Sequence, residues 1–464
     1  MKAFVLLLLT ASIMVSAEEP AGQGSVPGHL AKWVTQDRLD PPAAGSVLFI
    51  GSSSIRRWDS LARDFADYHV IQRGWGGSWL AEMDEAFPHV VLPCKPAAIV
   101  MWAGTNDLSG GRSGEQVHDD FLTFLRLLRR HLPTTPFLYL GATPTLANAG
   151  TTAARKTANS LIEATIETDP HAYYIDLAAH FEALGREDLE KLYVDPIHLN
   201  RAGYAVWLGL IRPRLEEVLK PNKTFVANPD APAAGDRVLF DFGPHDALRI
   251  DGHATEGPDA DGRHWNNWFP VDGGARITSG EHKAGLVNAD GRPNGMRWTI
   301  TGGFVANGLR NGGLFPPHGP APDLLGGLAV ATATEDYFFS TADDRKGGGD
   351  DDLPGGFMLS GLNPELAYTF RFFGTRADAD VRRTEYAVHG SGHWTATLRT
   401  SGADIGSDGS YDGNDDEIAV IEGVRPDAFG QVFVDMLAIE GGFAYLGAME
   451  IDVSEPGASG GSPR

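Results

Sequence analysis

Short apolar runs alternate with longer amphipathic segments over the first half of the chain. Residues 115–132 place apolar side chains on one helix face, after a Ser113-x-x-Gln116 capping box, and residues 200–219 repeat this spacing. Apolar runs of the length of buried strands lie at 47–50, 70–72, 97–102, 137–140 and 173–177. Strands that alternate with helices predict an α/β fold in three layers, with a parallel, flavodoxin-like sheet covered on both faces.

The pattern changes after Leu219. Residues 220–235 are polar and rich in proline and alanine, which is typical of a linker. From 236 to 453, short strand-like runs are separated by Gly, Asp and Pro loops, as in a β-sandwich or jelly-roll domain. The runs are 237–243, 296–303, 328–339, 367–376, 384–390, 417–424, 430–439 and 444–451. We expect residues 454–464 to be a disordered tail.

The first residues have the pattern of a secretory signal. Met1-Lys2 precedes an apolar stretch that closes on Val15-Ser16-Ala17, so we predict a signal peptide at 1–17 and a mature α/β domain at 18–219. The protein is therefore expected to be secreted or periplasmic, although an uncleaved anchor is the alternative. No later apolar run approaches the roughly 20 residues that cross a bilayer, so no integral membrane association is expected.

The net charge and the cysteine count of the chain limit the classes of partner and of cross-link to be expected. The 464 residues carry a formal net charge of −23, which repels phosphate backbones and anionic lipid. Nucleic acid is therefore not expected as a partner, and a neutral substrate fits better. The single cysteine, Cys94, excludes an intramolecular disulfide and is expected to be buried.

Four polar blocks stand at predicted strand ends or far downstream. They are "GSSS" at 51–54, "QRGWGGS" at 72–78, "WAGTND" at 102–107 and "DPIHLN" at 195–200. Each block alone is typical of a cap or a turn. Together they supply the parts of acyl transfer, namely a serine hydroxyl, a histidine base, an aspartate that orients the base, and donors for an oxyanion.

In these blocks the sequence resembles the SGNH (GDSL-type) hydrolase family, and within it the platelet-activating-factor acetylhydrolase-like esterases. The resemblance covers about 45–219, with all four family blocks in order. It implies a three-layer α/β fold and hydrolysis of esters or thioesters through an acyl-enzyme. It also implies that neither a metal nor another cofactor is needed.

The resemblance assigns roles to particular residues. Ser53 takes the place of the nucleophile, with Ser52 where the family usually has aspartate, and Ser54 is expected to cap the next helix. Asp195 and His198 complete the catalytic triad. The oxyanion hole is expected from Ser53, Gly77 and the side-chain amide of Asn106. Asp107 is interpreted as structural.

The substrate is less well defined by the sequence. Trp75, Trp79 and Trp102 flank the predicted site and are candidate substrate contacts, although tryptophans after strands usually serve packing. Acetyl esters of an oligo- or polysaccharide are the leading prediction, by resemblance. The alternatives are a lipid-directed acylhydrolase or thioesterase, and a non-catalytic carbohydrate-binding protein.

Two segments of the predicted β-domain leave alternatives open. "HWNNWFP" at 264–270 fits either a sugar-binding surface or a buried aromatic cluster. "DGSYDGNDDE" at 408–417 begins like a calcium-binding EF-hand loop, but its twelfth position is Ala419, which favours a solvated acidic loop.

Overall fold

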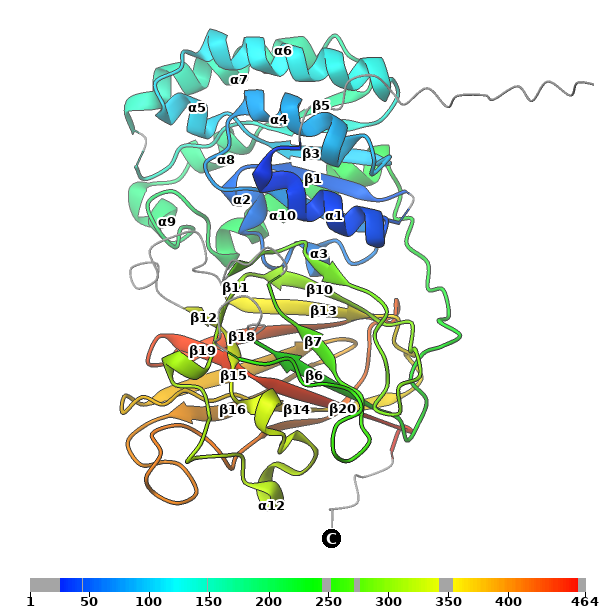
Figure 1. Cartoon of the computed structure of the whole chain (residues 1–464). Helices are drawn as coiled ribbons and strands as arrows, with labels where there is room; N and C mark the ends of the chain where they lie inside the picture. Colours follow the sequence, from blue (N-terminus) through cyan, green and yellow to red (C-terminus); the bar gives the residue numbers. More distant parts are fainter. Residues whose placement is uncertain are drawn as a thin grey trace, which may run out of the picture.

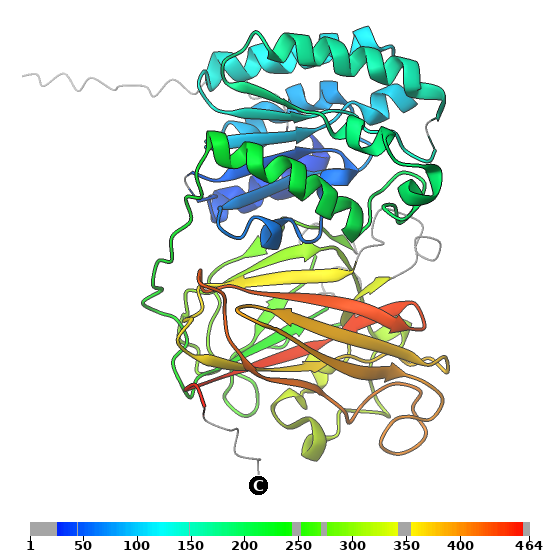
Figure 2. The same cartoon turned by 180° about the vertical axis from the view of Figure 1, so that it is seen from behind.

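The computed structural model describes residues 26–43, 45–147, 149–243, 252–270, 276–341 and 354–457. It consists of an α/β domain followed by a β-domain, joined by an extended linker along one side (Figures 1 and 2). The predicted signal peptide and residues 458–464 of the predicted tail lie outside the described residues. Within the described ranges, no helix combines the length and the apolar character needed to span a bilayer.

The α/β domain is built on a five-stranded parallel sheet in the order β2-β1-β3-β4-β5. Its strands are β1 (Val47–Gly51), β2 (Val70–Gly74), β3 (Ala98–Trp102), β4 (Phe137–Leu140) and β5 (Ala172–Ile175). They coincide closely with the five predicted apolar runs. The predicted fold class is confirmed, and β2 is left as an edge strand.

Helices cover both faces of this sheet (Figure 1). Along β1, Leu48 and Ile50 enter the core of one face, whereas Val47 and Phe49 enter the core of the other. The first face is covered by η1 (Gly28–Leu30), α1 (Ala31–Leu39), α4 (Leu80–Ala86), η2 (Phe87–Val91), α6 (Gly114–His131) and α7 (Thr152–Ile166). The second face is covered by α2 (Ser53–Arg56), α3 (Leu61–Asp64), α8 (Leu177–Glu182), α9 (Arg186–Glu190) and α10 (Arg201–Val218). The short elements α5 (Thr105–Ser109) and η3 (Ala149–Thr151) complete the domain.

The β-domain is a sandwich of mainly antiparallel sheets. A six-stranded sheet, β16-β15-β18-β13-β10-β9, faces a five-stranded sheet, β17-β14-β20-β6-β7, and β19-β12-β11-β8 forms a third. Aromatic rings join the two larger sheets: the centroids of Phe242 and Trp298 lie 5.0 Å apart, and those of Phe372 and Tyr386 lie 4.3 Å apart. The predicted β-sandwich is therefore confirmed.

The strands and short helices of the β-domain have the following bounds: β6 (Arg237–Phe242), β7 (Asn266–Trp268), β8 (Arg276–Ile277), β9 (His282–Lys283), β10 (Arg297–Gly302), β11 (Phe304–Asn307), η4 (Leu309–Asn311), α12 (Pro322–Leu325), η5 (Gly326–Leu328), α13 (Ala331–Thr334), β12 (Tyr337–Thr341), β13 (Gly355–Ser360), β14 (Ala367–Phe373), β15 (Arg382–His389), β16 (His393–Ser401), β17 (Ala419–Val424), β18 (Val432–Glu440), β19 (Phe443–Leu446) and β20 (Ala448–Ser454).

Two strand predictions in the β-domain are wrong in detail. The run 328–339 contains the short helix α13 before β12: its "ATAT" stretch alternates like a strand, but half of it is alanine, the strongest helix former. The run 444–451 is two strands, β19 and β20, which belong to different sheets and are separated by Gly447.

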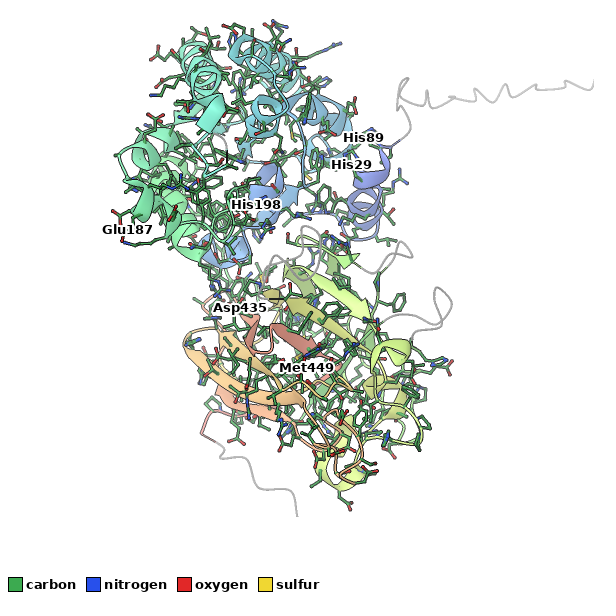
Figure 3. All side chains as sticks on the ribbon, turned by 90° about the vertical axis from the view of Figure 1, so that its left-hand side faces the viewer. His29, His89, Glu187, His198, Asp435 and Met449 are labelled. Carbon is green, nitrogen blue, oxygen red and sulfur yellow. The ribbon has the colours of Figure 1, made fainter. Side chains whose placement is uncertain are left out.

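The β-domain packs against the edge strand β2 and the end of α2. Gly280 approaches β2 so closely that a Cβ there would lie 2.5 Å from the Gln72 carbonyl oxygen. The Ser279 hydroxyl donates a hydrogen bond of 2.6 Å to the Arg56 carbonyl oxygen in α2. Asp435 of β18, at the side of the β-domain that faces the α/β domain, pairs with Arg63 and Arg201 at 3.0 Å each (Figure 3). The second domain therefore supports the segment that carries the predicted nucleophile.

Candidate active site

The predicted nucleophile lies on a tight turn at the carboxyl end of β1. Gly51 has φ +149°, and a Cβ there would fall 1.9 Å from the Trp102 carbonyl oxygen, so only glycine fits. Ser52 is the N-cap of α2, its N–H donates to Trp102, and Ser53 is the first residue of the helix. The prediction that Ser54 caps the helix is wrong, because the helix begins one residue before it.

Ser53, His198 and Asp195 form one continuous chain of hydrogen bonds. His198 Nε2 lies 2.9 Å from Ser53 Oγ, and His198 Nδ1 lies 2.6 Å from Asp195 Oδ2. All three side chains are at least partly buried at the carboxyl edge of the sheet. With Nδ1 protonated and bound to the carboxylate, Nε2 is free to accept the serine proton.

The environment of Asp195 keeps its carboxylate charged. Partial burial alone would raise the pKa of Asp195, but hydrogen bonds from the His198 ring and from the N–H groups of His198 and Ile197 hold this pKa well below its usual value. The guanidinium of Arg57 lies 3.7 Å from Asp195 Oδ2. A carboxylate that stays ionised stabilises the imidazolium formed during catalysis.

A backbone hydrogen bond closes the loop that carries Asp195 and His198. The N–H of Val194 donates to the His198 carbonyl oxygen at 2.9 Å. Immediately afterwards, Asn200 Oδ1 accepts from Ala202 N at 2.9 Å and caps α10. The Tyr204 hydroxyl then donates to the Ser54 carbonyl oxygen at 2.8 Å, which joins α10 to α2. The base and the nucleophile are therefore held by elements that brace each other.

The two blocks that supply the predicted oxyanion donors, residues 72–78 and 102–107, are joined by a hydrogen bond. The Asn106 side-chain amide donates to the Ser78 carbonyl oxygen at 3.0 Å, one residue after Gly77. Asp107 is fully buried and both its carboxylate oxygens lie 3.1 Å from Leu80 N. Burial raises the pKa of Asp107 to about 6. These contacts support the structural interpretation of Asp107.

A very small cavity lies beside the nucleophile. Asn106 and Ser53 both line it, together with Trp102 and Ile197, and its volume is about 10 Å³. Gly77 is exposed in the neighbouring turn with φ +73° and does not line this cavity. A cavity of this volume holds about one water molecule.

The first half of the chain also matches a known family. Residues 44–206 match the model of the GDSL-like Lipase/Acylhydrolase family. This stretch is a GDSL-like lipase/acylhydrolase domain. A curated relative, the alpha1 subunit of platelet-activating factor acetylhydrolase IB from Pongo abelii, is 27% identical over 173 residues, which are 34% of this chain and 70% of the relative. The family resemblance predicted from the four blocks is confirmed.

Solved structures with similarity to the chain carry related descriptions. A GDSL-like lipase from Bacteroides thetaiotaomicron VPI-5482 is 17% identical, with 41% of this chain and 98% of that chain covered and a TM-score of 0.35. A carbohydrate esterase of family 3 from Talaromyces cellulolyticus is 17% identical, with 37% and 97% covered and a TM-score of 0.32.

The three predicted tryptophan contacts lie in different surroundings of the GDSL-like domain. Trp102 is buried against Trp207, with ring centroids 4.7 Å apart, and lines the small cavity. Trp79 is 38% exposed, with the Arg112 guanidinium 5.9 Å from its ring centroid. Trp75 packs against Trp33 in a separate groove. Only Trp102 is brought together with Ser53 around one cavity.

Two residues that support the site were not assigned a role from the sequence. Gln72 is buried in β2, and its side-chain amide donates to the carbonyl oxygens of Ile55 at 2.6 Å and Trp58 at 3.1 Å. It therefore holds the turn that follows Ser53. Arg57, described above beside Asp195, is 2% exposed. Its place four residues after Ser53 was the only sequence signal for its role.

The structure gives the contacts of both ambiguous segments of the β-domain. Trp265 and Trp268 are 6% and 8% exposed, and the amide of Asn266 donates to the carbonyl oxygens of Leu239 and Val287, so this segment belongs to the aromatic core. In the acidic loop, carboxylates accept from backbone N–H groups of the same loop. No group of three or more metal-binding side chains occurs in the part of the chain that the structure describes.

Proposed function

We propose that the protein is a secreted serine esterase that hydrolyses carboxylic esters through an acyl-enzyme on Ser53. The observation that carries this proposal is the hydrogen-bonded chain Ser53–His198–Asp195. His198 Nε2 accepts the Ser53 proton as Oγ attacks the ester carbonyl carbon. The resulting oxyanion is stabilised by N–H donors of Ser53 and Gly77 and by the amide of Asn106.

His198 moves a proton in both halves of the reaction, first to the leaving alcohol and later from the attacking water. His198 returns its proton to the leaving alcohol oxygen, and the acyl group stays on Ser53. A water molecule then gives a proton to His198, attacks the acyl carbon and releases the acid, and the proton goes back to Ser53. Asp195 keeps the imidazole in one orientation throughout.

The acyl group is proposed to be acetyl. The cavity of about 10 Å³ beside Ser53 suits a small acyl group such as acetyl better than a long acyl chain. Similarity to a protein named as an acetylhydrolase is consistent with this choice.

The alcohol part is proposed to be a carbohydrate. Beside the Trp75-Gly76 turn lies a groove of about 380 Å³, lined by Trp33 and Trp75 and by polar groups that include Lys32 and Arg56. Trp33 is almost fully buried, so the half-buried ring of Trp75 is the aromatic face of this groove, which does not include Ser53. Such a face with nearby polar donors suits a sugar ring better than a lipid chain. A lipid-directed acylhydrolase remains the second candidate, because the relative named above acts on platelet-activating factor.

Substrate panels separate these candidates. Acetate release from acetylated xylan or pectin, together with faster hydrolysis of p-nitrophenyl acetate than of the octanoate, is expected. Preference for the octanoate would favour the lipid-directed enzyme. Absence of hydrolysis of every ester by the intact protein would leave a carbohydrate-binding protein instead.

Export is part of the proposal and rests on the sequence pattern of residues 1–17 alone. Expression of the full chain with its own amino terminus is expected to yield a mature protein that begins at Glu18 outside the cytoplasm. Amino-terminal sequencing of the extracytoplasmic fraction checks this, and retention of Met1 would contradict it.

A further inference from the structure

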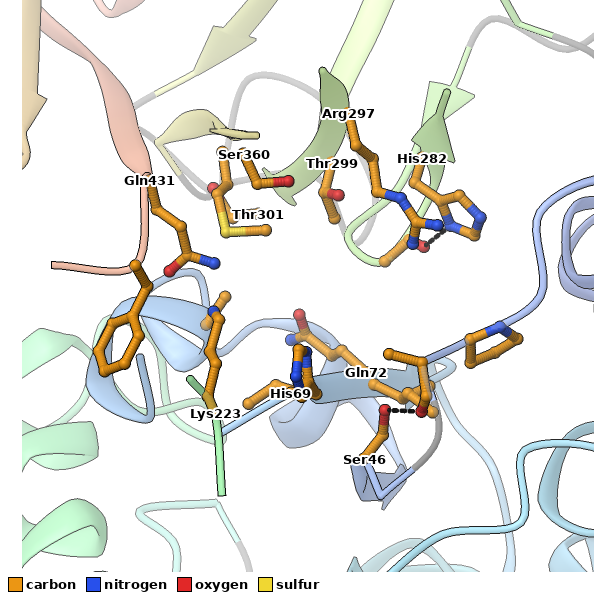
Figure 4. A pocket seen from close by; sticks show the side chains of 18 of the residues that line it. Ser46, His69, Gln72, Lys223, His282, Arg297, Thr299, Thr301, Ser360 and Gln431 are labelled. Atoms are coloured by element: carbon orange, nitrogen blue, oxygen red, sulfur yellow. Dashed lines mark hydrogen bonds between the residues drawn. The ribbon is translucent and has the colours of Figure 1, made fainter. Parts of the chain in front are cut away.

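A cavity with many polar lining residues lies between the two domains, away from the Ser53 turn. We call it the interface cavity; its volume is about 360 Å³, within the usual range for small-molecule sites. Strand β2 and the loop before it line one side, the linker residue Lys223 a second, and β10 with Gln431 the others (Figure 4).

The charge of the interface cavity is opposite to that of the whole protein. Lys223, Arg297 and Arg73 line it with His69 and His282, and no carboxylate is among its lining residues in the described chain. Burial lowers the pKa of His69, and the positive charges of Lys223 and Arg297 lower it further, as expected in a positive field. A chain with a net charge of −23 thus encloses a cationic hollow.

Not all of these cations are equally available. Arg297 pairs with Asp40, and Arg73 pairs with Asp37 at 2.6 Å. The ammonium of Lys223, in contrast, forms neither a hydrogen bond nor an ion pair with the described residues and only lies 5.5 Å from the Phe429 ring centroid. Its burial lowers the pKa of Lys223 to about 8. Lys223 is therefore the open positive charge of the cavity.

A buried acceptor in the same cavity is also without a partner. Gln431 is 3% exposed, and its Oε1 accepts no hydrogen bond from the described residues. In Figure 4 the side chains of Gln431 and Lys223 extend toward each other from opposite sides of the cavity. A buried unsatisfied acceptor is costly, and a ligand hydroxyl that donates to it would remove the cost.

We propose that the interface cavity is a binding site for a small hydroxylated carboxylate, such as a sugar acid. The carboxylate accepts from Lys223 Nζ, and a ligand hydroxyl donates to Gln431 Oε1. The hydroxyl groups of Ser46, Thr299 and Ser360 line the same space and suit further ligand hydroxyls. Inorganic phosphate would also satisfy the ammonium, and its P–OH could donate to Gln431 Oε1, but it offers fewer hydroxyl groups to meet Ser46, Thr299 and Ser360, which is why the sugar acid is favoured.

Calorimetric titration of the full mature protein with sodium glucuronate tests this site, with glucose and inorganic phosphate as parallel probes. Glucuronate is expected to bind, and glucose to bind at least about tenfold more weakly because it lacks the charge. Lys223→Met should weaken glucuronate binding at least about tenfold, whereas Lys223→Arg, which keeps the charge, should retain it.

Matched controls separate loss of the Lys223 charge from a general loss of charge or of folding. Lys191→Met removes an exposed lysine paired with Asp188 and should leave glucuronate binding unchanged. Ser53→Ala should also leave it unchanged, which separates this site from the candidate active site. Lys223→Met should hydrolyse p-nitrophenyl acetate like the parent protein, which shows that the variant is folded.

Four results would overturn the proposal, and the first three concern relative affinities. They are equal binding of glucose and glucuronate, tighter binding of phosphate than of glucuronate, and unchanged glucuronate affinity in Lys223→Met. Absence of glucuronate binding in a parent protein that hydrolyses esters would do so as well, without affecting the proposed esterase activity.

Discussion

The two hollows of the molecule differ in how their polar groups are satisfied. Beside Ser53, at a cavity of about 10 Å³, the imidazole of His198 is already hydrogen-bonded to the serine on one side and to the Asp195 carboxylate on the other before any substrate arrives. In the interface cavity of about 360 Å³, Lys223 and Gln431 each keep a group without a partner among the described residues. A reacting centre benefits from preorganised groups, whereas a binding site benefits from groups that await a ligand.

The largest effect on activity is expected from substitution of the nucleophile in the preorganised site. Ser53→Ala should reduce kcat for p-nitrophenyl acetate by about 10⁴-fold or more, because it removes the attacking atom. Ser54→Ala is the matched control in the same helical turn and should stay within a few-fold of the parent. Loss of activity in Ser54→Ala with activity kept in Ser53→Ala would move the nucleophile by one residue.

The oxyanion donor should give the next largest effect. Asn106→Ala should lower kcat about 10²- to 10³-fold with little change in KM, because the amide acts on charge that develops only in the transition state. Ser109→Ala, in the same short helix, serves as control and should keep parental kinetics. A change confined to KM would show that Asn106 binds substrate rather than the oxyanion.

The ion pairs between the domains should matter for stability more than for chemistry. Asp435→Asn leaves Arg63 and Arg201 without their shared carboxylate and should lower the free energy of unfolding by about 3 kcal/mol, as measured by denaturant titration. Asp188→Asn, which breaks an exposed pair with Lys191, should change it by less than about 1 kcal/mol. Equal losses in the two variants would contradict the role of Asp435.

The effect of Asp435→Asn on the free energy of unfolding should depend on pH. Burial alone would raise the pKa of Asp435, but His389, Arg201 and Arg63 hold it well below its usual value. A carboxylate with a lowered folded pKa contributes stability above its unfolded value, about 4, and loses that contribution as the pH falls toward the folded value. The stability difference between parent and Asp435→Asn should therefore be full at neutral pH and shrink below about pH 4.

The smallest effect is expected on acyl selectivity. Ile197 lines the small cavity and is 43% exposed, so Ile197→Ala enlarges the cavity without opening the core. The ratio of butyrate to acetate hydrolysis should rise a few-fold, since one methylene group changes selectivity by about tenfold or more in a closed pocket. Val194→Ala, in the same loop but outside the cavity lining, should leave the ratio unchanged.

Much of the α/β domain could be predicted because its strands and helices are marked by the pattern of neighbouring residues. The five apolar runs and the helix after the Ser113 capping box follow directly from periodicity, and the capping contacts are present at 2.9 and 3.3 Å. Three of the four polar blocks follow strands, and parallel strands end at one edge of a sheet. The block with Asp195 and His198 follows no strand and was assigned to the site by the family resemblance. In the structure, Ser53 lies within hydrogen-bond distance of His198, and His198 within hydrogen-bond distance of Asp195.

The rest depended on contacts between distant segments. The burial of Trp265 and Trp268 follows from how two sheets face each other, which strand periodicity does not specify. The strand predicted over 328–339 gives way to α13 because local composition there is ambiguous. Neither Lys223 nor Gln431 belongs to a motif, so the interface cavity is visible only once the linker and both domains are in place.

The close approach of Gly280 to β2 has a practical consequence for anyone who shortens this chain. Cutting after Leu219 would uncover the backbone of an edge strand, and exposed edges invite strands of other molecules to pair with them. The shortened protein is therefore expected to self-associate even where its catalytic groups stay intact. The β-domain thus protects the edge strand of the α/β domain from pairing with other molecules.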